Sequence, residues 1–353
     1  MQAQQADETL KLWYDKPADQ WVEALPLGNG RIGAMVFGDP AHEQFQLNEE
    51  TVWGGSPYNN TNPKAKDALP RIRQLIFEGK NAEAQALCGP TICSQSANGM
   101  PYQTVGTLHL DFDGISNYND YYRDLDIEKA VTTTRFTANG VTYTREAYTS
   151  FPDQILVIRL TASQKKSISF TAKYTTPYKE NVVRCISPRK ELQLNGKANN
   201  HEGIEGKVEF TALTRIENSG GNLEVLSDST LQVKNANSVT LYVSIGTNFV
   251  NYKDVSGNAQ ATAQKYLANV NKNYTKSKAA HINTYQKFFN RVSLDLGRNA
   301  QANKPTDVRV KEFSSSFDPQ MAALYFQFGR YLLICSSQPG GQASNLQGIR
   351  NYQ

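Results

Sequence analysis

The segment 47–57, Leu-Asn-Glu-Glu-Thr-Val-Trp-Gly-Gly-Ser-Pro, holds the densest group of side chains that could bind a polar substrate. The Asn48 amide, the Glu50 carboxylate and the Trp53 ring could line a sugar site, because aromatic faces stack on the C–H faces of pyranose rings. Acid–base cleavage of a glycosidic bond needs two carboxyls facing one substrate, about 5–5.5 or 6.5–9.5 Å apart. Neighbouring side chains of an extended segment point in opposite directions, so Glu49 and Glu50 are a poor catalytic pair. We predict Asn48, Glu50 and Trp53 as substrate-binding candidates. An ion-paired or capping Glu beside an interface Trp stays an open alternative.

The segment Gly28-Asn-Gly-Arg-Ile-Gly33 has the spacing of a dinucleotide-binding fingerprint. That fingerprint works only when a strand precedes it and a helix follows, so that helix amides face a pyrophosphate. Here Leu25-Pro-Leu27 precedes the motif, and Ala34–Gly38 after it reads as a strand. We therefore reject NAD or FAD binding and predict a tight glycine turn between strands.

The remaining reactive residues form no recognisable catalytic or metal motif. The four histidines, His42, His109, His201 and His281, lack metal-ligand spacing, and no Cys-x-x-Cys or Gly-x-Ser-x-Gly is present. Cys88 and Cys93 could form a small loop disulfide or remain free thiols, and both alternatives stay open. We predict no metal and no cofactor, and we expect the tyrosine cluster 118–122 to pack rather than bind.

Most of the chain from about residue 102 to 250 has the alternation and turn chemistry of β-strands. Segment 107–112 alternates with period two, and Asn139-Gly140 between segments 132–137 and 141–148 is a strong hairpin signal. Further strands are expected at 154–160, 168–174, 207–213, 223–226, 230–233 and 239–245. Many strands joined by short turns predict a large antiparallel sandwich.

Helical periodicity is confined to a few segments. A helical region is expected at 64–87, and helices at 259–271 and 276–290. A strand-like piece, 291–296, precedes a polar linker. A last helix should begin at Asp318-Pro319 and run to about Ser336.

Charge and hydropathy exclude several classes of partner. With 37 basic and 33 acidic residues the net charge is only +4, and no Lys/Arg stripe is present, so we expect no nucleic-acid partner. No segment reaches the roughly 18 apolar residues that span a bilayer. The start, residues 1–8, lacks the basic and apolar regions of a signal peptide. We expect an exported chain, periplasmic or extracellular, whose signal peptide is absent from this sequence.

Several blocks, taken in order, resemble glycoside hydrolase family 95, the inverting α-L-fucosidases and α-L-galactosidases. They are residues 12–18 with Trp21, 23–38, 47–53, 102–106, 122–126, 291–296, 325–334 and 336–349. The resemblance spans nearly the whole chain.

The resemblance implies a mainly β fold: a large antiparallel β super-sandwich, then a helical linker and the first helix of an incomplete (α/α)6 barrel. We place the domains at 1–253, 254–315 and 316–353. It also implies metal-free hydrolysis of glycans that end in α-L-fucose or α-L-galactose. Asn345 and Gln347, in the block Asn345-Leu-Gln-Gly-Ile349, are added as substrate-binding candidates.

By the same resemblance, the catalytic Glu, the water-holding Asn pair and the Asp lie in barrel segments beyond Gln353. Twelve helices need roughly 130 residues, whereas 318–353 suffices for one helix and a loop. Arg350 also stands where the family usually has Trp. We assign no catalytic residue to this chain and expect it to be an inactive, truncated part of a fucosidase-like parent.

The alternative is a non-catalytic carbohydrate-binding or scaffolding module. In either case we expect the helix at 318–336 to expose apolar side chains, to fold back, or to support a dimer.

Overall fold

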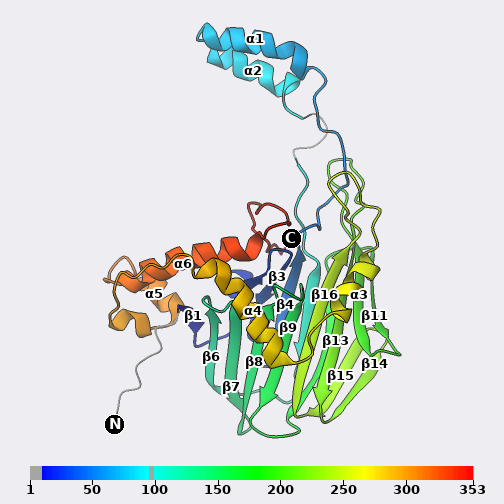
Figure 1. Cartoon of the computed structure of the whole chain (residues 1–353), viewed down its shortest axis with the longest axis vertical. Helices are drawn as coiled ribbons and strands as arrows, with labels where there is room; N and C mark the ends of the chain where they lie inside the picture. Colours follow the sequence, from blue (N-terminus) through cyan, green and yellow to red (C-terminus); the bar gives the residue numbers. More distant parts are fainter. Residues whose placement is uncertain (1–9, 95–98, 353) are drawn as a thin grey trace.

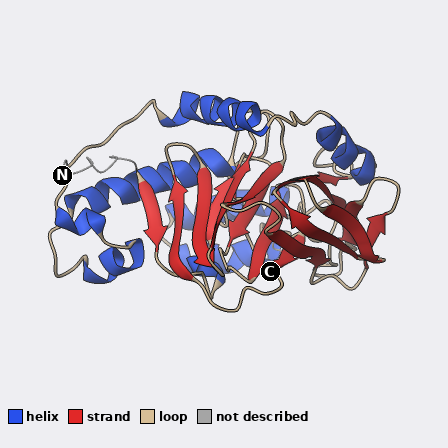
Figure 2. Cartoon of the chain, turned by 90° about the horizontal axis from the view of Figure 1, so that it is seen from below, coloured by secondary structure: helices blue, strands red, loops and turns tan. Residues whose placement is uncertain are grey.

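The computed structural model describes residues 10–94 and 99–352 (Figure 1). Residues 1–8, whose composition was read as a mature exported start, lie outside the described residues. Strands occupy the centre of the molecule and helices lie around them (Figure 2). The prediction of a mainly β fold built on two large antiparallel sheets is confirmed.

The larger sheet has nine strands in the order β1-β6-β7-β8-β9-β16-β13-β12-β11, and every neighbouring pair is antiparallel. Its strands are β1 Lys11–Tyr14, β6 Asn119–Asp126, β7 Val131–Ala138, β8 Val141–Thr149, β9 Leu156–Ala162, β11 Asn181–Ile186, β12 Glu191–Lys197, β13 Glu209–Ser219 and β16 Ser238–Thr247.

The smaller sheet has seven strands in the order β14-β15-β10-β5-β4-β3-β2, again antiparallel throughout. Its strands are β2 Leu25–Gly28, β3 Ile32–Val36, β4 His42–Glu49, β5 Gly106–Asp111, β10 Ile168–Thr175, β14 Asn222–Ser227 and β15 Thr230–Ala236.

The main core lies between the two sheets, where period-two alternation turns one face of each strand inward. In β5 the burial pattern alternates residue by residue, with Leu108 and Leu110 fully buried. They belong to the same cluster as Leu241 of β16 on the opposite sheet. Each such side chain contributes roughly 1.5–3 kcal/mol on burial, so the alternation seen in the sequence holds the two layers together.

The hairpin predicted at Asn139-Gly140 is confirmed, with φ of 52° and 73° at these two residues joining β7 to β8. The aromatic cluster near β6 packs, as expected. Tyr122 stacks on Trp13, and the Tyr121 hydroxyl donates to the Gly38 carbonyl at 2.8 Å. No strand was predicted at β1, β4, β6, β11 or β12. Strand β11 has no fully buried residue and therefore no clear inward-facing apolar stripe, whereas β12 alternates Leu192 and Leu194 with polar residues and was overlooked.

The segment Arg291–Leu296 is not a strand, so that expectation was wrong. No strand lies beside it in the described sheets. Its backbone is held instead by side chains of a helix: the Val292 carbonyl accepts from Gln327 at 3.3 Å and from Arg330 at 3.0 Å.

The helical region expected at 64–87 is two helices, α1 Ala65–Phe77 and α2 Asn81–Thr91. They are separated at Gly79, where φ is +73°. The Lys80 amide bonds the Leu75 carbonyl and the Gly79 amide bonds that of Ile76, which is a Schellman ending of α1. The pair projects from the sandwich as an arm (Figure 1) with its own small core around Ile72.

Two helices cover the outer face of the larger sheet. They are α3 Ala259–Ala268 and α4 Tyr274–Phe289, and each begins at an Asn whose side chain accepts from a backbone amide of the first turn. Ala263 and Leu267 of α3 enter a second apolar cluster with Tyr242 of β16. Helix α3 therefore packs directly on the larger sheet, and the domain boundary at 253/254 stays a prediction.

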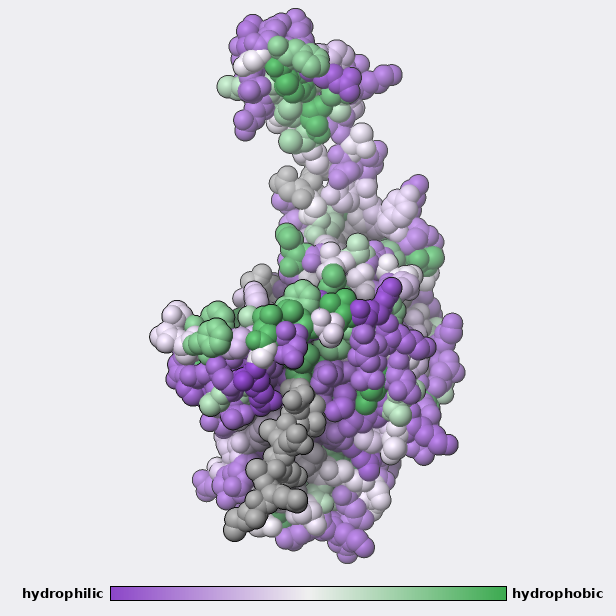
Figure 3. Space-filling model, turned by 60° about the vertical axis from the view of Figure 1, so that its left-hand side comes forward, coloured by the Kyte–Doolittle hydropathy of each residue, from purple (hydrophilic) through white to green (hydrophobic). Residues whose placement is uncertain are grey.

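The last helix, α6 Pro319–Ser336, follows the one-turn η2 Ala300–Asn303 and the short α5 Thr306–Glu312, and a further one-turn η1 Trp21–Glu23 precedes β2. The predicted Asp318 cap is confirmed, since its side chain accepts from the Met321 amide. One face of α6 docks on the sandwich, where the Tyr331 hydroxyl donates to the Pro26 carbonyl at 2.6 Å. The other face exposes Tyr325 and Leu333, and a hydrophobic band crosses this side of the molecule (Figure 3). Dimerisation through this face stays a prediction.

His281 of α4 is completely buried against Tyr148, and its Nε2 donates to the carbonyls of Lys129 and Ala130 at 3.0 and 3.1 Å. Burial lowers the pKa of His281 from 6.5 to about 4. The folded state therefore binds this proton less readily than the unfolded chain. Its contribution to stability is complete above pH 6.5 and is lost as the pH falls towards 4.

We predict that His281→Asn removes part of this acid sensitivity. In urea titrations between pH 6.5 and 4, the native protein should lose roughly 3 kcal/mol through this group, and the variant should fall less steeply. His201→Asn, at a half-buried histidine, serves as the control and should keep the native slope. Equal slopes for the native protein and His281→Asn would contradict the assignment.

Candidate functional site

The structure separates the five predicted binding residues. Glu50 lies at a polar cavity of about 410 Å³ where β4, β16 and α3 meet the loop after α6. We call this the Glu50 cavity. It is lined by Arg31, Glu49, Glu50, Thr51, Thr247, Phe249, Val250, Asn251, Tyr252, Thr262, Tyr266, Gly340, Gly341 and Gln342.

The side chains of Asn48 and Trp53 make hydrogen bonds and packing contacts within the chain. Asn48 is fully buried, and its Oδ1 accepts from the Asn351 amide at 3.1 Å while its Nδ2 donates to the Gln103 carbonyl. The Trp53 indole donates to the Glu50 carbonyl at 2.9 Å and packs against Tyr102 with ring centroids 5.2 Å apart. Both therefore support the loop that presents Glu50.

Asn345 and Gln347 lie at a different place, an apolar groove of about 530 Å³ between α6 and the start of the chain. The Asn345 side chain accepts from the Gln347 amide at 2.9 Å, and its carbonyl accepts from Gly348 at 3.0 Å. These contacts build a tight turn. The groove is walled by Leu12, Trp21 and Leu332, which suit apolar packing better than sugar hydroxyls.

The glycine motif joins β2 to β3, as predicted. Its glycines also let the backbone of Cys335 and Ile349 approach the two strands closely. A Cβ on Gly28 would lie 2.5 Å from the Cys335 carbonyl oxygen, and one on Gly33 would lie 2.4 Å from that of Ile349. The Gly30 amide also donates to the Cys335 carbonyl at 2.8 Å. No helix follows the motif, so it lacks the helix amides that a pyrophosphate requires. The motif is the surface on which the segment from Cys335 to Ile349 packs.

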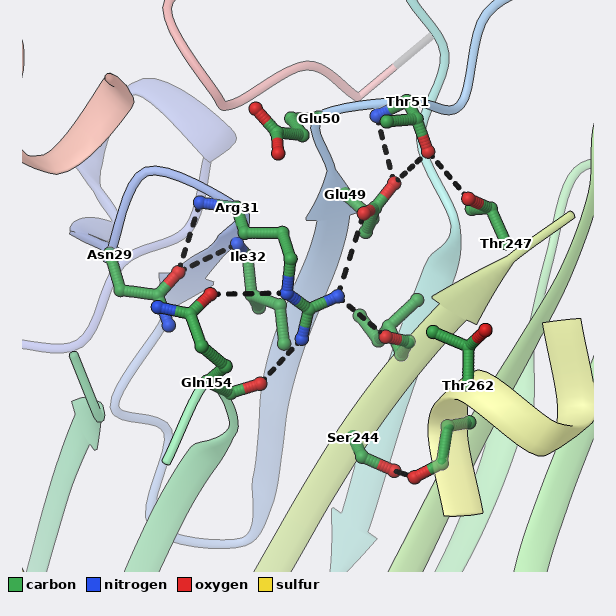
Figure 4. A network of polar contacts seen from close by, with 12 residues as sticks. Asn29, Arg31, Ile32, Glu49, Glu50, Thr51, Gln154, Ser244, Thr247 and Thr262 are labelled. Atoms are coloured by element: carbon green, nitrogen blue, oxygen red, sulfur yellow. Dashed lines mark hydrogen bonds and ion pairs between the residues drawn. The ribbon is translucent and has the colours of Figure 1, made fainter. Parts of the chain in front are cut away.

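Arg31, at the tip of that turn, ties together three elements (Figure 4). Its guanidinium donates to the Ile245 carbonyl at 2.6 Å, to the Gln154 side chain at 3.1 Å and to Glu49 at 3.5 Å. Its plane also lies 4.0 Å from the centroid of the Tyr266 ring of α3. Asn29 holds the turn by accepting from the Arg31 and Ile32 amides.

The two adjacent glutamates have different surroundings, as the extended backbone predicted. Glu49 is buried beside Arg31, and its Oε2 accepts from the Thr51 amide and hydroxyl at 2.8 and 2.6 Å. Burial raises the pKa of Glu49, and Arg31 opposes that rise. Glu50 points away from this network (Figure 4), is half-buried, and burial raises its pKa too.

The backbone of the loop after α6 holds the Glu50 carboxylate in place. Its Oε2 accepts from the Gln342 amide at 2.7 Å, and this contact lowers the pKa of Glu50 against the larger effect of burial. Sequence reasoning missed Gln342, Thr247 and Tyr266. They come from distant segments, and no local spacing connects them to Glu50.

Among residues 10–94 and 99–352, no three His, Cys, Asp or Glu side chains lie together as a metal ion would need. His109 bonds the Thr175 hydroxyl at 2.7 Å on β5. Cys88, Cys93, Cys185 and Cys335 are free thiols. No helix in this part of the chain is long and apolar enough to cross a membrane.

The fold and these sites can now be set beside known proteins. The profile of the glycosyl hydrolase family 65 N-terminal domain matches residues 12–252, and that of the glycosyl hydrolase family 95 catalytic domain matches residues 273–353. Both profiles describe glycosyl hydrolase domains, one over the sandwich and one over the segment that follows it. The chain belongs to glycoside hydrolase family 95.

Named relatives agree with this family. The chain is 33% identical to "Alpha-L-fucosidase 2" of Arabidopsis thaliana, over 99% of this chain and 45% of that protein. It is 30% identical to "Probable alpha-fucosidase A" of Aspergillus niger, over 96% of this chain and 44% of that protein. The chain therefore spans less than half the length of these curated relatives.

A solved structure shares the fold. It is described as "Putative kojibiose phosphorylase from human microbiome", and it superposes with a TM-score of 0.51 at 9% identity. The superposition covers 93% of this chain and 43% of that one. At this identity the likeness concerns the fold alone.

We predict that Arg31→Met destabilises the protein by about 3–5 kcal/mol, because it leaves the Glu49 carboxylate buried without its cation. Urea unfolding at neutral pH measures the loss. Arg189→Met removes a more exposed arginine, 4.0 Å from Glu191, and should cost under about 1 kcal/mol.

The double variant Arg31→Met with Glu49→Gln should recover part of the loss, since no charge is then left unpaired. If Arg31→Met lowers the free energy of unfolding no more than Arg189→Met does, Arg31 is not the cation that stabilises buried Glu49.

Proposed function

We propose that this chain is the N-terminal part of a glycosidase that releases terminal α-L-fucose or α-L-galactose from glycans with inversion. The observation that carries the proposal is the match along nearly the whole chain to proteins named as α-fucosidases. The two domain profiles, one after the other, support the same class of enzyme.

The carboxylates at the candidate site support an inactive isolated chain. Inverting hydrolysis needs a carboxylic acid on one side of the scissile bond and a carboxylate with room for water on the other, about 6.5–9.5 Å apart. Of the two glutamates at the Glu50 cavity, Glu49 is engaged with Arg31 and Thr51 and is 3% exposed. Both glutamates line the cavity, but only Glu50 has a carboxylate oxygen without a hydrogen-bond partner among the described residues, and one such carboxyl cannot supply both roles.

We predict that the 353-residue chain does not hydrolyse a chromogenic α-L-fucoside, whereas a full-length family member with this N-terminal part does. Release of the chromophore is the readout, and chromatography or NMR of the fresh product reports inversion. Clear turnover by the purified chain, removed together with the protein by immunodepletion, would contradict the proposal.

The alternative function is a non-catalytic carbohydrate-binding or scaffolding module, favoured by the open Glu50 cavity. Binding of a sugar without hydrolysis by the full-length protein would support this alternative. An exported location stays a prediction as well.

A further inference from the structure

The Glu50 carboxylate is placed as an acceptor with one oxygen free. Its backbone amide donates to the Arg31 carbonyl at 2.9 Å, and its Oε2 accepts from the Gln342 amide at 2.7 Å. Its other oxygen, Oε1, accepts no hydrogen bond from the described residues. Gly341 passes so close that a Cβ there would lie 3.0 Å from Oε2 and 3.5 Å from Oε1. The carboxylate is therefore fixed from one side and free on the side of the cavity.

The contact with the loop after α6 uses only one of the two carboxylate oxygens of Glu50. The nearby cation, Arg31, already bonds Glu49, Ile245 and Gln154 and makes no hydrogen bond to Glu50. Glu50 is thus half-buried, next to another carboxylate, and without a direct cationic partner. A partly desolvated charge of this kind costs stability unless a ligand completes its hydrogen bonds.

The other residues that line the Glu50 cavity are polar, aromatic or aliphatic. The charges of Arg31 and Glu49 offset each other. The Thr51 and Thr247 hydroxyls bond one another at 2.6 Å. Tyr252 is 76% exposed at the rim, and Lys253 Nζ lies 5.2 Å from the centroid of its ring. A small uncharged ligand with hydroxyl donors and a C–H face matches these walls, and about 410 Å³ is within the range of small-molecule sites.

We propose that the Glu50 cavity binds one neutral pyranose unit of a glycan, with Glu50 Oε1 accepting from the hydroxyl groups of the sugar and Tyr252 lying against its C–H face. The choice of a sugar rests on the proposed function, whereas the site itself rests on the geometry. It is a binding site within this chain and needs no catalytic group. Glu50 is its specificity-determining acceptor.

The experiment titrates the purified 353-residue chain with L-fucose and L-galactose by calorimetry and by saturation-transfer NMR. Glu50→Gln is the main variant. Its amide oxygen can still accept from Gln342, while its NH2 group places a donor where Oε1 was. Binding should weaken roughly tenfold to a hundredfold, as expected for losing a hydrogen bond to a charged group. Glu83→Gln, on the exposed surface of the arm, is the matched control and should bind as the native chain does.

A second variant guards against misfolding. Tyr252→Ala changes an exposed side chain, so it should fold normally and still weaken sugar binding. The thermal midpoint of each variant is measured alongside its affinity. Loss of binding in Glu50→Gln with a native midpoint is the expected result.

Three outcomes would overturn the proposal. They are no saturable sugar binding by the native chain, equal binding by Glu50→Gln, and preferential binding of D-glucosamine or D-glucuronate over neutral sugars. Without saturable binding, the cavity is not a site for these sugars. Equal binding by Glu50→Gln would show that Glu50 does not contact the ligand, and a preference for a charged sugar would show that the ligand is not neutral.

The outcome separates this proposal from the proposed function. Sugar binding through Glu50 in a family member that leaves α-L-fucosides intact would refute the activity and keep the site. Hydrolysis by the full-length protein with no sugar binding by this chain would refute the site and keep the activity.

Discussion

The close passage of the segment 335–349 over the β2–β3 hairpin is the constraint on which the candidate site depends. Gly28 and Gly33 leave no Cβ between the sheet and the carbonyls of Cys335 and Ile349. The segment can therefore lie directly on the strands, and Arg350 reaches back to the Leu27 carbonyl at 3.0 Å. Because both ends of this segment are held on the strands, the loop between them lies next to Glu50. The Gln342 amide donates to Glu50 there and closes one side of the cavity. A motif with nucleotide-binding spacing thus acts as a docking surface on the sandwich for a segment within the catalytic-domain match, residues 273–353.

Arg31 gives two chemically identical neighbours different surroundings: Glu49 is buried in its network, and Glu50 lies outside that network at the cavity. Arg31 bonds Glu49 inside the protein, where the Thr51 amide and hydroxyl also donate to its carboxylate, and Thr247 in turn bonds the Thr51 hydroxyl. Alternation along the backbone sends Glu50 to the opposite side. The same guanidinium lies over Tyr266, so the position of α3 and the shape of the cavity follow from the same interaction.

Much of the fold could be predicted from the sequence because it rests on local signals. Asn139-Gly140 tolerates positive φ and fixed a hairpin, and Asp318-Pro319 marked the start of α6. The segment 291–296 misled, since its apolar alternation looks like a strand but side chains of α6 hold its backbone. Strand β11 was not predicted because none of its residues is fully buried, so it carries no clear inward-facing apolar stripe.

The candidate site was less predictable for a physical reason. Glu50 was predicted only as one of three candidates, together with Asn48 and Trp53, and the contact that orients it comes from Gln342, 292 residues away. Asn345 and Gln347 were named as candidates because they lie in a block that resembles the family, not because of any predicted proximity to Glu50. The structure places them at the apolar groove. Pairings at such separation depend on how the sheets stack, which periodicity within one segment does not specify.

Native-state amide hydrogen exchange of residues 335–351 tests the seating of this segment most directly. The account predicts slow exchange at Gln342 and Asn351, whose amides donate to Glu50 and Asn48, and fast exchange at the fully exposed Leu346 between them. Uniformly fast exchange along the whole segment would show that it does not lie on the sandwich, and would contradict both this packing and the cavity that the segment closes.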